Sequence, residues 1–176
     1  HRDAPRGLDE QLHKALLISC RQGHINIFNQ ITSNPRLNHL IHWREPKSGR
    51  TALYWATMNF NQYCPGGSFA VIPLQSLNGK KQVIETLINH YDMQLSQKDS
   101  IGQTPLFNVA IEAGEAYVIL KDVISNEQLT NELDRLINLH NPNSNHPLFL
   151  ASKLTDLGEK GVKRWLEQYP DAVSAR

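Results

Sequence analysis

Residues 102–107 read Gly-Gln-Thr-Pro-Leu-Phe, and residues 49–56 read Gly-Arg-Thr-Ala-Leu-Tyr-Trp-Ala. In both stretches a Thr follows a Gly by two residues and precedes a run of apolar side chains. A Thr hydroxyl in that place can accept an unpaired backbone N–H group from the first turn of a helix. The Pro that follows Thr104 lacks an N–H that would be unpaired there anyway. Both stretches therefore predict the start of a helix directly after Thr51 and Thr104.

Two weaker copies of the pattern lie nearer the ends of the chain. Residues 14–17 read Lys-Ala-Leu-Leu and lead through Cys20 to Gly23 and His24, and residues 145–151 read Asn-His-Pro-Leu-Phe-Leu-Ala. Each copy is followed by a second apolar patch with the spacing of a helix, which makes the recurring unit a pair of helices. These second patches are Ile25, Ile27, Phe28 and Ile31; Val83, Ile84, Leu87 and Ile88; Val118, Ile119, Val123 and Ile124; and Val162, Trp165 and Leu166.

This unit resembles the ankyrin repeat, whose recurring phrase is Gly-x-Thr-Pro-Leu-His-x-Ala followed by a Gly before the second helix. The resemblance spans residues 10–170 in four irregular repeats, at about 10–42, 43–92, 93–137 and 138–170. It implies an all-α ankyrin-repeat solenoid of stacked antiparallel helix pairs. Residues 1–9 would be a disordered lead or a cut end, and residues 171–176 a tail.

The repeats are longer than the regular ~33 residues of the family. The steps between the equivalent positions Lys14, Thr51, Thr104 and His146 are 37, 53 and 42 residues. The largest insertion, residues 58–79, falls between the two helices of the second repeat and contains Cys-Pro-Gly-Gly at 64–67. Turn residues beside a short β-prone run predict an ordered loop or small hairpin there. Leucines at helical spacing predict an additional or lengthened helix at 126–139.

Charge and hydropathy argue against two classes of partner. The chain has 176 residues, and its 18 Lys plus Arg against 17 Asp plus Glu leave a net charge of +1, too weak a field to hold nucleic acid or an anionic membrane unaided. No apolar run approaches the ~18 residues of a membrane span. Short basic clusters such as Lys80-Lys81 stand beside acidic residues and are interpreted as solvated helix faces. We expect a monomer that binds no nucleic acid and does not insert into membranes.

The inventory of reactive residues predicts no catalysis, no cofactor and no metal. Two cysteines, Cys20 and Cys64, allow neither a disulfide framework nor a four-Cys zinc site, which favours a reducing, cytoplasmic compartment. Cys20 is predicted to be a core residue, and the loop around Cys64 carries no nucleophile signature. His39 and His42 lack further ligands at zinc-like spacing. The common phosphate-loop and hydrolase motifs are absent.

A surface for a partner protein remains, and the resemblance implies where it lies. In ankyrin repeats it is the concave side, built from the first helices and the loops between repeats, here at about 42–50, 94–103 and 138–145. The inserted segment adds apolar side chains that either pack onto the repeats or face a partner. Trp55 likewise either anchors a partner or packs under the insertion. Trp and Arg are over-represented among binding hot spots. The candidate partner-binding residues are Trp43, Arg44, Arg50, Trp55, Tyr63 and Phe69.

The expected function is therefore that of a protein–protein interaction module without catalysis. A rival interpretation is a substrate-targeting or regulatory segment of a larger enzyme. The irregular, Asn- and Gln-containing repeats resemble the ankyrin modules of secreted bacterial effectors that act on host proteins, which would place the chain in a host cytosol. In a third interpretation the inserted loop makes the domain an enzyme, and Cys64 would then react faster than an ordinary exposed thiol.

Overall fold

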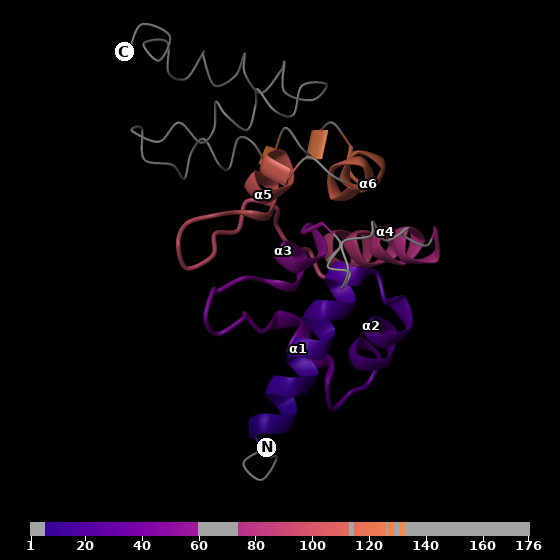
Figure 1. The fold of residues 1–176 in the computed structure, drawn as a ribbon, viewed down its shortest axis with the longest axis vertical. Coiled ribbons are helices and arrows are strands. Elements are labelled where there is room, and N and C mark those ends of the chain that lie inside the picture. The colour runs from indigo at the N-terminus through magenta and orange to yellow at the C-terminus, as the bar shows by residue number, and fades with distance from the viewer. Residues whose placement is uncertain (1–5, 60–73, 113–114, 126, 129–130, 133–176) are drawn as a thin grey trace, which may run out of the picture. The chain divides into compact units, whose positions relative to one another are not determined.

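A computed structural model describes residues 6–59, 74–112, 115–125, 127–128 and 131–132 (Figure 1). The chain divides into two compact units, residues 1–123 and 124–176. The described residues form helices and contain no strand. For that part of the chain the all-α prediction is confirmed.

The described residues of the first unit form three successive pairs of helices. Helix α1 packs against α3, and α3 against α5, while α2 packs against α4, and α4 against α6. The first helices of the pairs therefore form one layer and the second helices another. The fourth predicted pair, in residues 138–170, lies outside the described residues. The elements are α1 (Arg6–Gln22), α2 (Ile25–Thr32), a 3-10 turn η1 (Asn38–His42), α3 (Ala52–Ala56), α4 (Leu74–Asn89), α5 (Pro105–Glu112) and α6 (Glu115–Val123).

The predicted helix starts are confirmed at both clear copies of the phrase. Thr51 precedes α3 in an extended conformation, and its hydroxyl accepts the Tyr54 backbone N–H at 3.2 Å. Helix α5 begins at Pro105, directly after the buried Thr104. Local capping chemistry, rather than packing alone, thus fixes where these helices begin.

The core lies between the two helix layers. Apolar side chains predicted to face inward are fully or almost fully buried, among them Leu16, Phe28, Leu53, Ile84 and Leu106. Cys20 belongs to this core, as predicted, and burial raises the pKa of its thiol to about 12. It stays protonated at neutral pH, and a protonated thiol is a poor nucleophile.

Two predicted boundaries are wrong. The expected lead, residues 1–9, already contains the start of α1 at Arg6, and the expected insertion, residues 58–79, overlaps the first six residues of α4. An Asn-Gly pair such as Asn78-Gly79 is typical of turns. Here Gly79 is buried inside a helix, because the missing side chain lets α4 touch the backbone at Gly23. The rest of the insertion, residues 60–73, lies outside the described residues.

Helix α1 ends at that point of contact. Gly23 adopts a φ of +69°, and the N–H of His24 reaches back to the Ser19 carbonyl at 3.0 Å. This is the Schellman type of helix end, which favours glycine because a side chain is strained in the left-handed region. The chain thus reverses into α2 within two residues.

Lys80 corrects a third prediction, because it is not part of a solvated helix face. Its side chain is fully buried, and the ammonium donates to the backbone carbonyls of Arg21, at 2.7 Å, and of Met58. Those carbonyls lie at the C-terminal end of α1 and just beyond that of α3. The C-terminal end of a helix carries unpaired carbonyls and partial negative charge, both of which attract a cation.

In the second unit the described residues are few, but they contain the start of the helix predicted near 126. The Ser125 backbone N–H donates to Oε1 of Gln128 at 2.9 Å, and the Gln128 backbone N–H donates to Oγ of Ser125 at 3.1 Å. This reciprocal pair is a capping box. Of the residues that follow, only 131–132 are described, also as helix.

Candidate functional site

Two loops that are far apart in sequence lie side by side. Residues 44–50 and 98–103, together called the loop cluster below, project from the same side of the first-helix layer (Figure 1). The Ser100 N–H donates to the Ser48 carbonyl at 2.9 Å. Nη1 of Arg44 donates to the carbonyls of Lys98, at 2.9 Å, and of Gly49, at 3.3 Å. A side chain from the first loop therefore holds the backbone of the second.

The first loop is closed by its own acidic residue. The Glu45 N–H donates to the Arg50 carbonyl at 2.9 Å, and the Gly49 N–H donates to the Glu45 carbonyl at 2.7 Å. Oε2 of Glu45 accepts the Ser48 N–H at 2.7 Å and also the Ser48 hydroxyl. The Ser48 hydroxyl lowers the pKa of the Glu45 carboxyl. An Asp or Glu whose oxygens accept loop N–H groups is a common way to fix a turn.

The second loop is closed by Asp99 in the same manner. Oδ1 of Asp99 accepts the backbone N–H groups of Ile101, at 3.0 Å, and of Gln103, at 2.8 Å. The Asp99 N–H donates to the Gln103 carbonyl at 2.8 Å. The remaining oxygen, Oδ2, lies 3.4 Å from Nε of Arg50. Asp99 therefore holds its own loop and ties it to the first loop.

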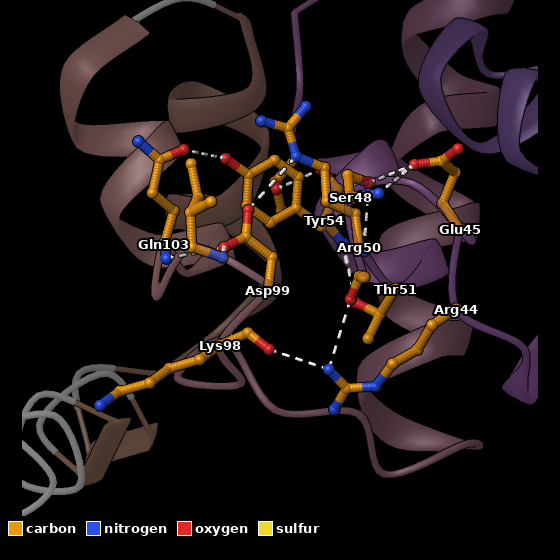
Figure 2. A network of polar contacts seen from close by, with 12 residues as sticks. Arg44, Glu45, Ser48, Arg50, Thr51, Tyr54, Lys98, Asp99 and Gln103 are labelled. Carbon is orange, nitrogen blue, oxygen red and sulfur yellow. Dashed lines mark hydrogen bonds and ion pairs between the residues drawn. The ribbon is translucent and has the colours of Figure 1, made fainter.

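Arg50 lies between this carboxylate and an aromatic ring. Its guanidinium carbon stands 4.4 Å from the centre of the Tyr54 ring, whose hydroxyl donates to Oε1 of Gln103 at 3.3 Å (Figure 2). The Asp99 side chain is 1% exposed and the Arg50 side chain 28% exposed. The acid is thus buried inside the cluster, while part of the cation reaches solvent.

Trp43 precedes the loop cluster and is anchored by two histidines. Its ring meets His13 of α1 and His39 of η1 edge-on, with ring centres 5.7 and 5.5 Å apart. Nε2 of His13 lies 3.2 Å from the Trp43 carbonyl, to which it donates. Trp43 remains 38% exposed. The indole is therefore held against the scaffold, and only part of it is accessible.

The buried His13 predicts a pH dependence of stability. Burial lowers its pKa below the ordinary 6.5, although the bond to the Trp43 carbonyl and the charge of Glu45 act in the opposite direction. The unfolded chain therefore takes up a proton at a higher pH than the folded chain, and stability falls as the pH drops below about 6.5. We expect the melting temperature to decrease between about pH 7.5 and 5.5.

The His13→Gln variant is the control, since its amide keeps an N–H for the Trp43 carbonyl but does not titrate. Its melting temperature should change less over the same range, measured by circular dichroism. The pH window stays above the range in which Glu45 contributes, because the lowered pKa of Glu45 makes its stabilisation disappear only in acid. An equal slope for the variant and the unaltered chain would contradict the role of His13.

A cavity of about 370 Å³ adjoins the loop cluster. Tyr91, which meets His42 edge-on with ring centres 5.8 Å apart, forms one part of its wall. Arg44 belongs both to the wall of the cavity and to the loop cluster. The side chains and backbone that line the cavity include Ile41, His42, Arg44, Thr51, Tyr91 and Gln94.

The structure brings three of the six predicted binding residues together. Trp43, Arg44 and Arg50 lie in or beside the loop cluster. Trp55 lies apart from them in α3; it is partly buried, and its indole N–H is shielded from solvent and has no hydrogen-bond partner among the residues described. Tyr63 and Phe69 lie outside the described residues.

Sequence reasoning found Arg44 and Arg50 but missed the residues that hold Arg50 and Trp43 in place. Asp99 was detectable in principle, because an acidic residue three positions before the Gly of the phrase is well placed to accept N–H groups of the turn. His13 and Tyr54 carry no such local signal, because their partners are 30 and 49 residues away in the sequence.

Replacing Asp99 tests whether the cluster is held by that carboxylate. Asp99→Ala leaves two loop N–H groups and the Arg50 guanidinium without their acceptor, and should lower the free energy of unfolding by about 1.5 kcal/mol. Asp99→Asn keeps one acceptor oxygen and should lose less. Urea unfolding of both variants measures the difference. An unchanged Asp99→Ala variant would contradict the assignment.

Within the described ranges, no group of three or more His, Cys, Asp or Glu side chains could hold a metal ion. Among the helices of those same ranges, none has the length and apolar character needed to cross a membrane. Comparison with protein-family models, curated proteins and solved structures finds no match to this chain.

Proposed function

We propose that this chain is an ankyrin-repeat type of protein-interaction module, and that it recognises a partner protein through the loop cluster and the adjoining first-helix layer. It has no catalysis of its own and acts as a monomer in a reducing, cytoplasmic compartment. The repeated helix pairs are the scaffold in this proposal, because stacked pairs bury a continuous core and leave their loops on one side.

The main support for the proposal is the set of hydrogen bonds and the ion pair that join two successive loops. Exposed loops ordinarily lose conformational entropy when a partner binds, and each ordered side chain costs about 0.5–1.5 kcal/mol. Here the Arg44 guanidinium, the Arg50–Asp99 ion pair and the Ser100–Ser48 backbone bond hold the loops in advance. A preformed surface of this kind binds with less loss of entropy.

The composition of that surface supports the same proposal. Trp43 is partly exposed, its ring contacts two histidines of the scaffold, and it directly precedes Arg44. A rigid aromatic ring offers contact area at low entropic cost, and a guanidinium offers several directed donors. Residues of these two types, held by their own scaffold, are typical of the centre of a protein interface.

The experiment is an affinity capture from a eukaryotic cell lysate with the full chain as bait. Two double variants are used as baits in parallel: Arg44→Ala/Lys47→Ala in the loop cluster and Tyr63→Ala/Phe69→Ala in the inserted segment. Lys81→Ala/Gln82→Ala in α4 removes a comparable amount of side chain from the second-helix layer and is the matched control. Circular dichroism verifies that each variant is folded.

We expect one or more proteins that bind the unaltered chain and the control but not the loop variant. Loss with the Tyr63/Phe69 variant as well would extend the surface to the insertion. Partners retained by the loop variant and lost from the α4 control would place recognition on the other layer and contradict the proposal. Absence of any specific partner would contradict it as well.

A further inference from the structure

The loop cluster carries an excess of positive charge in a chain that is nearly neutral. Its residues include four cations, Arg44, Lys47, Arg50 and Lys98, and two anions, Glu45 and Asp99. The whole chain of 176 residues has a net charge of only +1. Two of these four cations, Arg44 and Lys47, are exposed to solvent.

Both anions of the cluster bond within the loops, Asp99 with a buried side chain and Glu45 with a partly exposed one. Asp99 is 1% exposed on its side chain and uses both oxygens, one for two backbone N–H groups and one for Arg50. Oε2 of Glu45 is occupied by the backbone and hydroxyl of Ser48. The outward surface is therefore more positive than the composition of the loops indicates.

The two arginines keep unused donors. Arg50 bonds through Nε, and Figure 2 shows its two terminal nitrogens directed away from Asp99. Arg44 bonds through Nη1, which leaves Nε and Nη2 without an acceptor among the described residues. Because an existing contact fixes each guanidinium, its remaining N–H groups are held in the planar arrangement that a carboxylate accepts.

The cavity beside Arg44 adds room for a neighbouring side chain. Its volume of about 370 Å³ is large enough for one side chain of a bound peptide. Ile41 and Met93 are apolar parts of the wall, Tyr91 and Gln94 are polar ones, and the Asp92 carboxylate favours a neutral or basic side chain in the cavity itself. Arg44 lies at the border between the cavity and the cluster. A carboxylate on Arg44 and a side chain in the cavity could therefore come from adjacent residues of one extended segment.

We propose that the loop cluster and this cavity bind an extended acidic segment of the partner protein, with carboxylates on Arg44, Lys47 and Arg50 and one flanking side chain in the cavity. This inference rests on the proposed function and names the chemistry of its partner. Nucleic acid is the less fitting occupant, because the cluster offers few cations and the described loops present no series of aromatic rings on which bases could stack.

The test selects peptides on the full chain from a phage-displayed library of random dodecapeptides. We expect the bound sequences to contain more Asp and Glu than the unselected library. Synthetic copies of three bound sequences then give dissociation constants by fluorescence anisotropy. Their affinity should fall as the salt concentration is raised from about 0.05 to 0.3 M, because the contacts are exposed charges.

Variants locate the contacts. Arg44→Gln should weaken binding about tenfold, as expected for a central arginine. Lys47→Glu changes a side chain that makes no hydrogen bond among the described residues, although its charge acts on Glu45, and should weaken binding about fivefold through charge repulsion. Lys81→Glu makes the same charge change on α4 and should alter the affinity by less than about twofold.

Selected peptides without an acidic bias, or affinities equal in Lys47→Glu and the unaltered chain, would overturn the inference while leaving a protein-binding surface in place. Selection of no peptide above background would also overturn it, and the capture experiment above would then decide the proposed function separately. A single-stranded oligonucleotide serves as a competitor. If it displaces the peptides, binds more tightly than they do and loses affinity in Lys47→Glu, the surface would be assigned to nucleic acid instead.

Discussion

Replacing Gly79 by alanine is expected to destabilise this protein, although alanine is the better helix former by about 1 kcal/mol. A Cβ atom built on Gly79 would overlap the Gly23 carbonyl oxygen and stand 3.0 Å from the carbonyl carbon. The obstacle is backbone, which cannot rotate away as a side chain can. Relief requires α4 to move off the end of α1.

The expected loss is about 2–3 kcal/mol, the upper part of the range for overpacked sites. For a chain of this size that corresponds to a decrease in melting temperature of roughly 6–10 °C. Thermal unfolding followed by circular dichroism measures it. Gly23→Ala should destabilise the protein at least as much. Its Cβ would overlap the Ser76 carbonyl and lie 2.7 Å from the backbone nitrogen of Lys80. Gly23 also has a φ of +69°, which strains any residue with a side chain.

The matched control is Gly7→Ala near the start of α1, where a Cβ would meet nothing within 4 Å. It should be neutral or slightly stabilising, since only helix propensity changes. A Gly79→Ala variant that is as stable as Gly7→Ala would show that α4 does not rest on the Gly23 backbone, and the contact between the first two helix pairs would have to be revised.

Lys80→Met is expected to lower the free energy of unfolding by about 2 kcal/mol. Methionine matches the lysine side chain as far as Cε, but it lacks the ammonium that donates to the carbonyls of Arg21 and Met58. The variant gains from not burying a charge, but it leaves buried acceptors at two helix ends without the cation they face. Leaving both carbonyls without a donor outweighs that gain, because the Arg21 carbonyl is held by α1 and the Met58 carbonyl lies just beyond α3.

Urea unfolding of Lys80→Met and of the neighbouring Lys81→Met separates the buried lysine from the partly exposed one. Lys81→Met should lie within about 0.5 kcal/mol of the unaltered chain, as surface substitutions usually do. Amide hydrogen exchange should also accelerate at the C-terminal ends of α1 and α3 in Lys80→Met alone. A more stable Lys80→Met variant would contradict the capping role and mark the buried ammonium as a net cost.

The parts of the fold that could be predicted are those with local causes. Thr51 caps the helix that follows it, and Pro105 begins one, because each acts on backbone groups within a few residues. The second helices were recognisable for a similar reason, since their buried residues repeat with the helical period. Such short-range signals are sufficient to predict which segments are helices and that the helices follow one another in pairs.

Long-range contacts explain the errors. Gly79 was assigned to the insertion and Lys80 to a solvated face, and only the approach of α4 to Gly23 reverses both interpretations. No local pattern reports that approach, because the two glycines are 56 residues apart in the sequence. The start of α4 at Leu74 was missed for the same reason.

The candidate site was predictable in its residue types but not in its assembly. Arg44 and Arg50 stand out in a loop beside Trp43, and the structure places them in one cluster. Their partners come from the next loop, with Arg50 paired to Asp99 and Arg44 bonded to the Lys98 carbonyl. Each arginine therefore has two roles: one part of its guanidinium holds the two loops together, and its remaining N–H groups are available to a partner. Composition alone does not indicate the first of these roles.

The most direct measurement of the central claim is site-specific photocrosslinking of the full chain in a eukaryotic lysate. A benzophenone amino acid is placed at position 47 in the loop cluster or at position 82 on α4, both exposed. Recognition through the loop cluster predicts a distinct covalent protein adduct from position 47, abolished by Arg44→Gln, and none from position 82. An adduct from position 82 alone, or none from either position, would contradict the claim.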